Sequence, residues 1–417
     1  MSFDRRRLLV LPLAAGAALW AGRPAWASAA GGDAPGTAPG TTSATAPATS
    51  AAVPGTAPVP EQSVPFTAGQ DGYATYRIPA VVRTRRGTLV AFAEARASGS
   101  DTGSIVVAAK RSTDGGRTWG PLAVVAGDGT NTQGNPCPVV DPRTGDIVLL
   151  TCTNAASASE TAIMAGQVPP EDGRRVWVQR GTDDGRVFSP PREITAQAKH
   201  PDWRWYATGP GHAIALTSGP HRGRLVVPAN HSTPPAPGTS DTGTEAKYYG
   251  GHCLLSDDGG ETFRIGFVDD TPDGAVDPNE STAAQLPDGT VYFNARNQGG
   301  TDPASRVDAR SADGGEHLLH PYAPQPGLVG PKVAGSVLQL PGGPLLFSGP
   351  GDPGSRAAMA LRTSTDGGRT WRTATVLSSA PAGYSDLVRL SPTEVGLLYE
   401  TGSASPYETL TFARLPI

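Results

Sequence analysis

The chain of 417 residues contains little lysine and little cysteine. Four lysines stand among 34 basic residues, and 38 acidic residues leave a formal net charge of −4. So small a net charge gives no support for binding of nucleic acid or anionic lipid. The three cysteines, Cys137, Cys152 and Cys253, are an odd set, so a disulfide framework does not organise the fold. One pair could form outside the cell, and the sequence leaves open which.

Sequence motifs for metal and nucleotide binding are also missing. His212 and His252 have no HxH or HxxxH partner and few cysteines nearby, which favours structural histidines over zinc ligands. No glycine-rich loop follows a strand and opens a helix, so nucleotide binding has no support. We therefore expect neither a metal nor a cofactor.

An apolar run from Leu8 to Leu19 follows Arg5-Arg6-Arg7 and precedes the small-residue cleavage site Ala25-Trp26-Ala27. The run is shorter than the roughly 20 residues that a membrane-spanning helix needs. Residues 1–27 are therefore predicted to be an export signal of the twin-arginine type rather than an N-terminal core helix. Because no cysteine closely follows the cleavage site, we expect no lipid anchor. The mature protein should be secreted, extracellular and not inserted in a membrane.

Composition divides the rest of the chain into two parts. Residues 28–60 consist mainly of Ala, Pro, Thr, Gly and Ser, which cannot bury enough apolar surface to order a segment, and are predicted to form a disordered leader. Residues 61–417 are a succession of short apolar runs such as TLVAFAEAR, SIVVAAKRS and TVYFNARN, separated by turn signals. Runs of that length and composition predict an all-β domain.

A self-similar motif recurs among these runs. STDGGRTW occupies residues 112–119 and returns unchanged at 364–371, SDDGGETF occupies 256–263, and looser copies begin at residues 181 and 311. The Asp and Ser side chains can bond backbone amides in a hairpin turn, glycine supplies positive φ, and the aromatic residue packs below. Copies spaced by 53 to 75 residues suit one four-stranded blade each, so a six-bladed β-propeller is predicted. The aspartates of the motif are interpreted as turn residues remote from any chemistry.

The stretch Tyr76-Arg77-Ile78-Pro79 is unusual because it places a charge in an apolar strand. Together with the repeated boxes it resembles the sialidase (neuraminidase) family, over nearly all of residues 61–417. The resemblance implies a six-bladed propeller, here expected to be a monomer, that hydrolyses terminal sialic acids from sialylated glycans. It also implies a retaining mechanism, in which a tyrosine paired with a glutamate is the nucleophile.

The chemistry explains why such residues are needed. Sialic acid carries a carboxylate on its anomeric carbon, so a neutral phenol is a better attacking group than a second carboxylate. The phenol has an ordinary pKa of about 10 and needs a base. Arginine suits the sugar carboxylate because its planar fork donates two parallel hydrogen bonds. An aspartic acid must protonate the leaving oxygen and later activate water.

The resemblance assigns these roles residue by residue. Tyr384 in AGYSDLVRL is the expected nucleophile and Glu280 in DPNEST its base. Asp101 in ARASGSDTGS is the expected acid/base, with Asp71 as its rival. Arg77, Arg296 and Arg356 are expected to bind the carboxylate, with Arg362 as the competitor of Arg356 and Glu400 as the brace of Arg77. Arg96 is expected to contact a ring hydroxyl, and Asn135 to lie near the acetamido side of the pocket.

Other functions are compatible with parts of this pattern. A non-catalytic sialoglycan-binding propeller would also carry Asp boxes, but it predicts the loss of at least one catalytic role. An enzyme for another nonulosonic acid, or a trans-sialidase, would differ only in pocket loops. An Asp-box glucanase has no use for three arginines.

Overall fold

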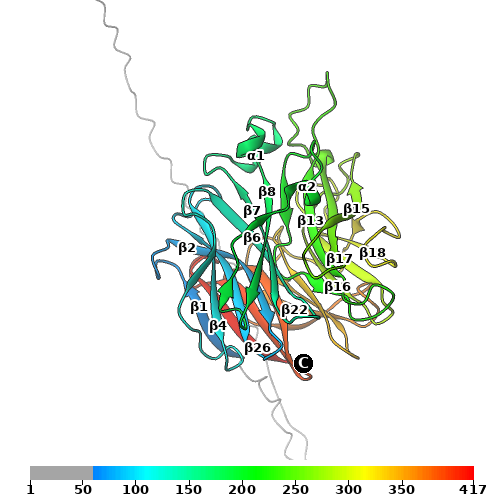
Figure 1. The fold of residues 1–417 in the computed structure, drawn as a ribbon. Helices are drawn as coiled ribbons and strands as arrows, with labels where there is room; N and C mark the ends of the chain where they lie inside the picture. Colours follow the sequence, from blue (N-terminus) through cyan, green and yellow to red (C-terminus); the bar gives the residue numbers. More distant parts are fainter. Residues whose placement is uncertain (1–59) are drawn as a thin grey trace, which may run out of the picture. The chain divides into compact units, whose positions relative to one another are not determined.

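The computed structural model describes residues 60–417 (Figure 1). The predicted signal, residues 1–27, and nearly all of the predicted leader lie outside the described residues. No helix in the described part has the length and apolar character to cross a bilayer.

The described residues form five β-sheets. The first and last strands of the domain pair with each other, with Glu61 opposite Arg414 and Thr67 opposite Thr409, so the chain closes on itself (Figure 1). That closing sheet has the order β1 (Glu61–Thr67), β26 (Thr409–Pro416), β25 (Glu394–Thr401) and β24 (Ala382–Ser391).

The next sheet holds nine strands of the described chain. Its two halves are antiparallel ladders joined by the parallel pair Ile105–Thr132. The first half comprises β2 (Thr75–Arg83), β3 (Leu89–Arg96), β4 (Ile105–Ser112) and β5 (Ala123–Ala126). The second comprises β6 (Thr132–Val140), β7 (Ile147–Asn154), β8 (Arg175–Thr182), β9 (Val187–Phe188) and β10 (Arg192–Glu193).

The other three sheets follow in chain order. One contains β11 (Tyr206–Thr208), β12 (Ile214–Ala215), β13 (Leu225–Ser232), β14 (Tyr249–Ser256) and β15 (Arg264–Asp270). The next contains β16 (Pro278–Gln285), β17 (Val291–Asn297), β18 (Arg306–Ser311) and β19 (Ala323–Pro324). The last contains β20 (Ser336–Gln339), β21 (Leu345–Pro350), β22 (Met359–Ser364) and β23 (Arg372–Val376). Short helices α1 (Glu160–Met164), α2 (Thr195–Ala198), η1 (Pro170–Asp172) and η2 (Ala246–Tyr248) lie in the connections.

The prediction of an all-β propeller is confirmed, but the predicted count of six blades is not. Four sheets of the described chain have the size of one blade, four or five strands, and the remaining strands form one continuous sheet. The reason lies in the segment before β6. The Ile105 amide donates to Asn131 O at 3.2 Å and the Thr132 hydroxyl donates to Gly103 O at 3.0 Å, so β4 and β6 stay hydrogen-bonded.

The Asp boxes form the expected turns. In the first box, Asp114 Oδ1 accepts the amides of Arg117 and Thr118, each at 3.0 Å, and the Gly116 amide donates to Ser112 Oγ at 2.8 Å. The same glycine-to-serine bond measures 2.8 Å in the boxes that begin at residues 256, 311 and 364. Gly116 has φ 88°, and a Cβ there would lie 2.2 Å from the Phe412 ring. A larger residue is therefore excluded both by the backbone and by the packing.

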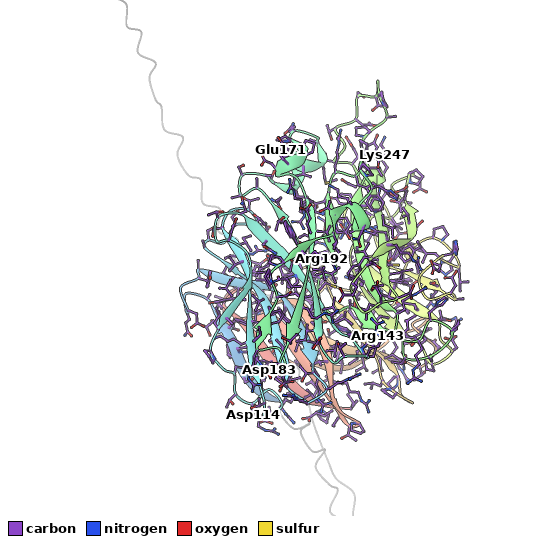
Figure 2. The ribbon with its side chains drawn as sticks, in the orientation of Figure 1. Asp114, Arg143, Glu171, Asp183, Arg192 and Lys247 are labelled. Carbon is purple, nitrogen blue, oxygen red and sulfur yellow. The ribbon has the colours of Figure 1, made fainter. Side chains whose placement is uncertain are left out.

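The boxes lie at the opposite end of the strands from the loop that carries Asp101. β4 starts at Ile105, just after that loop, and ends at Ser112, the first residue of a box. Figure 2 shows Asp114 and Asp183, from two boxes, low in the view, and Glu171 and Lys247 high in the view. The box that follows β4 thus lies at the far end of that strand from the Asp101 loop.

Apolar side chains fill the space between neighbouring sheets. One cluster brings together Phe66 of β1, Tyr76 of β2, Leu398 of β25 and Phe412 of β26. Burying one such side chain stabilises the fold by about 2 kcal/mol. A small cluster of Ile78, Val333, Ala334 and Tyr384 joins β2 and β24 to the segment just before β20.

Candidate active site

The strands β2, β6, β16 and β24 each carry an irregularity in register at the place where a candidate residue occurs. The interruptions lie between Arg77 and Ala80 in β2, Gly134 and Cys137 in β6, Pro278 and Ser281 in β16, and Ala382 and Ser385 in β24. A β-bulge bends its strand and re-aims a side chain. The four candidate residues at these bulges are Arg77, Asn135, Glu280 and Tyr384.

The bulge at Arg77 has a backbone cost. Ile78 has φ 59°, which is a rare conformation for a β-branched residue. The conformation directs the Ile78 amide to Glu400 Oε1 at 3.1 Å. The same carboxylate receives Arg77 Nε at 3.0 Å and the Tyr384 amide at 3.0 Å. Glu400 is fully buried, and donors from β2 and β24 satisfy its carboxylate. Its negative charge compensates the Arg77 guanidinium, which explains how a charge is tolerated in β2.

Tyr384 and Glu280 are in direct contact. The phenol oxygen lies 2.6 and 2.7 Å from the two oxygens of the Glu280 carboxylate. Arg296, near the end of β17, donates one nitrogen to Glu280 Oε2 at 2.8 Å and to the phenol oxygen at 3.0 Å. Burial raises the pKa of the Tyr384 phenol far above its usual range, Glu280 raises it further, and Arg296 and Arg77 act in the opposite direction. The resting phenol is therefore protonated and hydrogen-bonded to the Glu280 carboxylate.

The other two predicted arginines lie against the ring of the same tyrosine. The guanidinium carbon of Arg77 is 5.1 Å from the centre of the Tyr384 ring, and that of Arg356 is 5.7 Å from it. Arg77, Arg296 and Arg356 therefore surround one aromatic side chain although they come from β2, β17 and the connection between β21 and β22. Such a concentration of positive charge indicates an anionic ligand.

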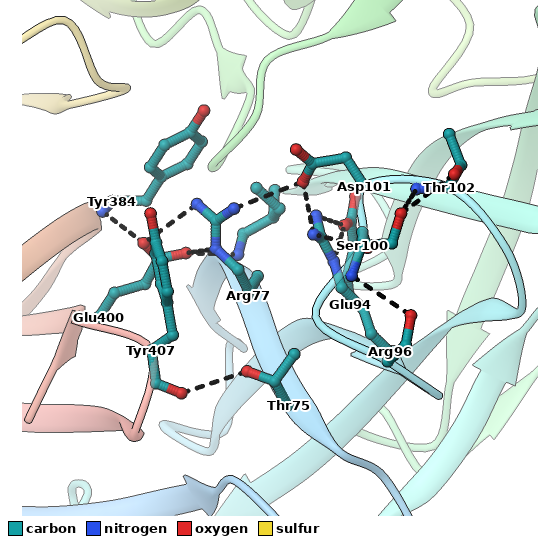
Figure 3. Close-up of polar contacts among 12 residues, drawn as sticks. Thr75, Arg77, Glu94, Arg96, Ser100, Asp101, Thr102, Tyr384, Glu400 and Tyr407 are labelled. Atoms are coloured by element: carbon teal, nitrogen blue, oxygen red, sulfur yellow. Dashed lines mark hydrogen bonds and ion pairs between the residues drawn. The ribbon is translucent and has the colours of Figure 1, made fainter. Parts of the chain in front are cut away.

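Asp101 and Arg96 form an ion pair at the edge of this group (Figure 3). Arg96 Nη1 lies 2.5 Å from Asp101 Oδ1, and Arg77 Nη1 lies 3.5 Å from the same oxygen. The Asp101 side chain is 80% exposed, so solvent or a ligand can reach it. Burial of the carboxyl alone would raise its pKa, but Arg96 and then Arg77 outweigh that effect, and the pKa of Asp101 is lowered.

Asn135 is fixed from both sides. Its amide nitrogen donates to Glu94 Oε1 at 2.8 Å, and its side-chain oxygen accepts Arg174 Nη2 at 2.6 Å. Glu94 also accepts Arg96 Nε at 2.9 Å, which links Asn135 to the Asp101 loop. A Cβ at Gly134 would fall within 2.1 Å of Glu94 Oε1, so only glycine leaves room for this carboxylate.

The structure places the alternative residues elsewhere. Asp71 accepts from Lys110 Nζ at 2.7 Å in a turn, and Arg362 donates to Val329 O at 2.6 Å. His212 Nδ1 lies 2.7 Å from Asp386, and His252 Nδ1 lies 3.1 Å from that of His231. The described cysteines are free and buried.

Comparison with known proteins gives the family. A family model described as a BNR repeat-like domain matches residues 87–397. An exo-alpha-sialidase from Aspergillus fumigatus is 31% identical over 357 residues, which cover 79% of this chain and 79% of that protein. The chain belongs to the sialidase family. A sialidase from Micromonospora viridifaciens is 32% identical over 386 residues, and there the match covers 86% of this chain but 56% of the relative.

Solved structures agree with the sialidase fold. The Hadza microbial sialidase Hz136 superposes with a TM-score of 0.72 at 26% identity, over 85% of this chain and 68% of that chain. A Trypanosoma rangeli sialidase in complex with the inhibitor DANA superposes with a TM-score of 0.63 at 19% identity, over 82% of this chain and 55% of that chain. The family predicted from the YRIP stretch and the boxes is thus confirmed.

Sequence reasoning missed several residues of this sialidase-family site. Glu94 was detectable, because it lies two residues before Arg96 and so on the same face of an apolar strand. Tyr249 donates its hydroxyl to Glu160 at 2.7 Å, and burial together with nearby Glu280 raises the pKa of Glu160. Neither residue had a local sequence signal. The same holds for Tyr407, whose ring centre lies 4.4 Å from the Arg77 guanidinium carbon.

Proposed function

We propose that the protein is an exo-α-sialidase that hydrolyses terminal α-ketosidically linked sialic acids of glycoconjugates and retains the anomeric configuration. Support comes from relatives named as sialidases and, above all, from a phenol bonded to both oxygens of Glu280 within a ring of three arginines. A structural tyrosine would not need a base and three cations around it.

The carboxylate of the sugar would lie between Arg77, Arg296 and Arg356. Arg77 and Arg296 already have carboxylate partners, Glu400 and Glu280, which hold their forks in place. Each charge-assisted bond to the substrate is worth about 2 kcal/mol. The neutral phenol of Tyr384 adds no repulsion to the bound anion.

In the first chemical step the Tyr384 oxygen would attack the anomeric carbon while its proton passes to Glu280. The bond from that carbon to the aglycone oxygen breaks, and Asp101 protonates the departing oxygen. In the second step Asp101 takes a proton from water, and the water oxygen attacks the same carbon. The bond to Tyr384 breaks and the phenolate recovers its proton from Glu280. Two inversions give net retention.

Asp101 poses a condition on this mechanism. In the free site its pairing with Arg96 favours the ionised carboxylate, whereas protonation of the leaving group needs the acid. We propose that the bound sugar takes over the hydrogen bonds of Arg96, as the predicted hydroxyl contact of that residue implies. Release from Arg96 would raise the pKa of Asp101 and allow it to carry the proton.

The remaining expectations belong to the same proposal. The protein would be exported through residues 1–27 and act outside the cell as a monomer on sialylated glycans. Transfer to an acceptor sugar, or action on another nonulosonic acid, would use the same catalytic residues.

The test is release of a fluorophore from an aryl α-sialoside by the purified protein, with the first-formed sugar anomer followed by NMR. Early appearance of the α-anomer supports a retaining hydrolase. Binding without turnover at any pH between 3 and 8 would instead support the non-catalytic sialoglycan-binding alternative. Transfer would show as a new sialoside when lactose is added.

A further inference from the structure

The three arginines around Tyr384 differ in what holds them. Arg77 is paired with Glu400 and Arg296 with Glu280. Arg356 forms no ion pair within residues 60–417, and its hydrogen-bond partner there is the hydroxyl of Tyr407, 2.8 Å from Nη1. Arg356 also comes from the connection between β21 and β22 rather than from a strand. A free arginine side chain in such a connection carries about 2 kcal/mol of rotamer entropy that binding would have to overcome.

Tyr407 contacts a second arginine of the same group. Its ring centre lies 4.4 Å from the guanidinium carbon of Arg77, closer than the Tyr384 ring at 5.1 Å. Figure 3 shows the Tyr407 side chain next to Arg77 and Glu400. Arg77 therefore contacts two aromatic rings, and Tyr407 connects it to Arg356.

The loop that carries Tyr407 is held by its own hydrogen bonds. The Glu408 carboxylate accepts the amides of Ser403, Ala404 and Ser405 at 2.9, 2.8 and 2.8 Å. Thr75 Oγ1 donates to Tyr407 O at 3.2 Å, which ties the loop to β2, the strand of Arg77. The tyrosine is thus presented from a fixed backbone.

The direction of the hydrogen bond to Arg356 is determined by chemistry. A guanidinium has no acceptor, so the phenol oxygen of Tyr407 accepts and its proton is left for another group. No acceptor of that proton is found among the hydrogen bonds of residues 60–417. The phenol therefore orients Arg356 as a neutral acceptor.

We infer that Tyr407 is a positioning residue of the carboxylate site, which orients Arg356 with its hydroxyl and Arg77 with its ring while leaving the charge of Arg356 uncompensated for an anionic ligand. A carboxylate in place of the phenol would orient Arg356 equally well but would cancel its charge. A neutral brace therefore preserves the attraction for the substrate anion. This inference rests on the proposed function for the identity of the anion.

The experiment compares Tyr407→Phe with wild type and with Tyr399→Phe. Tyr399 is a buried core tyrosine of β25 whose hydroxyl has one long bond, 3.4 Å from Gln62, so its variant controls for loss of a phenol hydroxyl. The probes are the 2,3-didehydro analogue of sialic acid, which keeps the carboxylate, and its methyl ester, which does not. Binding is measured by calorimetry and turnover with the aryl α-sialoside.

Tyr407→Phe should weaken the acid about tenfold, since a bond to a charged group is lost, and should leave the methyl ester within about twofold. KM should rise more than kcat falls. In an Arg356→Ala background the further effect of Tyr407→Phe should be below about twofold, because the hydroxyl acts through Arg356. Tyr399→Phe should bind both probes like wild type.

Equal weakening of acid and ester would overturn the inference, as would an undiminished effect of Tyr407→Phe in the Arg356→Ala background. Wild-type affinity of Tyr407→Phe for the acid would overturn it too. A wild-type protein that binds the acid but turns over no α-sialoside would contradict the proposed hydrolase function alone, because the calorimetric comparison still decides the role of Tyr407.

Discussion

The Asp-box turns and the arginine site use similar carboxylates in opposite ways. Asp114 accepts from residues three and four positions further along the chain, so its partners come with the motif. Glu400 accepts from Arg77, which lies 323 positions away, and from the Ile78 and Tyr384 amides. The comparison teaches that a local motif can build a turn at any blade, whereas the site exists only after the ring of strands has closed.

The looser box at Gly181 shows how far a turn can drift from the motif. Gly181 replaces the serine, and the Asp183 carboxylate has only long contacts, 3.4 Å to Arg186 and 3.8 Å to Arg86. Asp184 instead accepts from the Thr88 hydroxyl at 2.5 Å and from Arg111 at 2.9 Å, both outside the box. Contacts with Thr88 and Arg111 thus hold this turn in place. The blade keeps its turn although the box has lost its serine.

The largest difference between the two regions should appear in Tyr384→Phe. If Tyr384 is the nucleophile, as we propose, loss of its oxygen removes the covalent step, so kcat for an aryl α-sialoside should fall by about 10³-fold or more. Binding of the didehydro analogue should persist, because the arginines remain. Steady-state kinetics and calorimetry measure the two. Turnover close to wild type would remove Tyr384 from its proposed role, and Tyr399→Phe is the matched control.

Glu400→Gln tests the long-range bonds of the site. The substitution keeps the shape of the side chain but leaves Arg77 buried without its counter-charge, which costs about 3 kcal/mol of unfolding free energy. Urea denaturation followed by fluorescence measures the loss. A change below about 1 kcal/mol would mean that Arg77 is solvated or paired in another way. The control is Glu394→Gln, which removes the carboxylate that pairs with Arg414 in the same sheet.

Asp101→Asn should affect catalysis and leave stability nearly unchanged, because the side chain is exposed. For a poor leaving group kcat/KM should fall about 100-fold, and for an activated aryl group much less. In the wild type only the protonated acid can donate, so kcat/KM should decline as pH rises through the lowered pKa. Arg96→Gln removes the main cause of that lowering and should move the decline to higher pH. A decline at unchanged pH in Arg96→Gln would contradict the assigned cause.

The same contrast explains what the sequence could predict. The boxes are local, so their turns and the all-β propeller were readable from spacing alone. Arg77 stood out locally as a charge in an apolar strand. The other site residues, Glu280, Arg296, Arg356, Tyr384 and Glu400, were located only through the resemblance, because nothing local in FNARN or GLLYE shows which distant residue lies beside it. The six-blade count failed at hydrogen bonds of Asn131 and Thr132, which keep β4 and β6 joined. Tyr407 and Arg174 had no local sequence signal, since each contributes to the site through a distant residue, Arg356 and Asn135 respectively.

Asp114→Asn should have the smallest effect and should act on the fold alone. The hydrogen bonds from Thr118 hold the pKa of Asp114 well below its usual range, so the carboxylate stabilises the folded state above its unfolded pKa of about 3.9. That contribution is lost as pH falls towards the folded pKa. The variant should therefore lose about 1 kcal/mol at pH 7 and progressively less towards pH 3, while kcat/KM stays within about twofold. Urea denaturation at several pH values gives the stability difference. A fall in kcat/KM of more than about tenfold, measured where the variant is still fully folded, would contradict this prediction. It would show that a box affects the site from the far end of its strands.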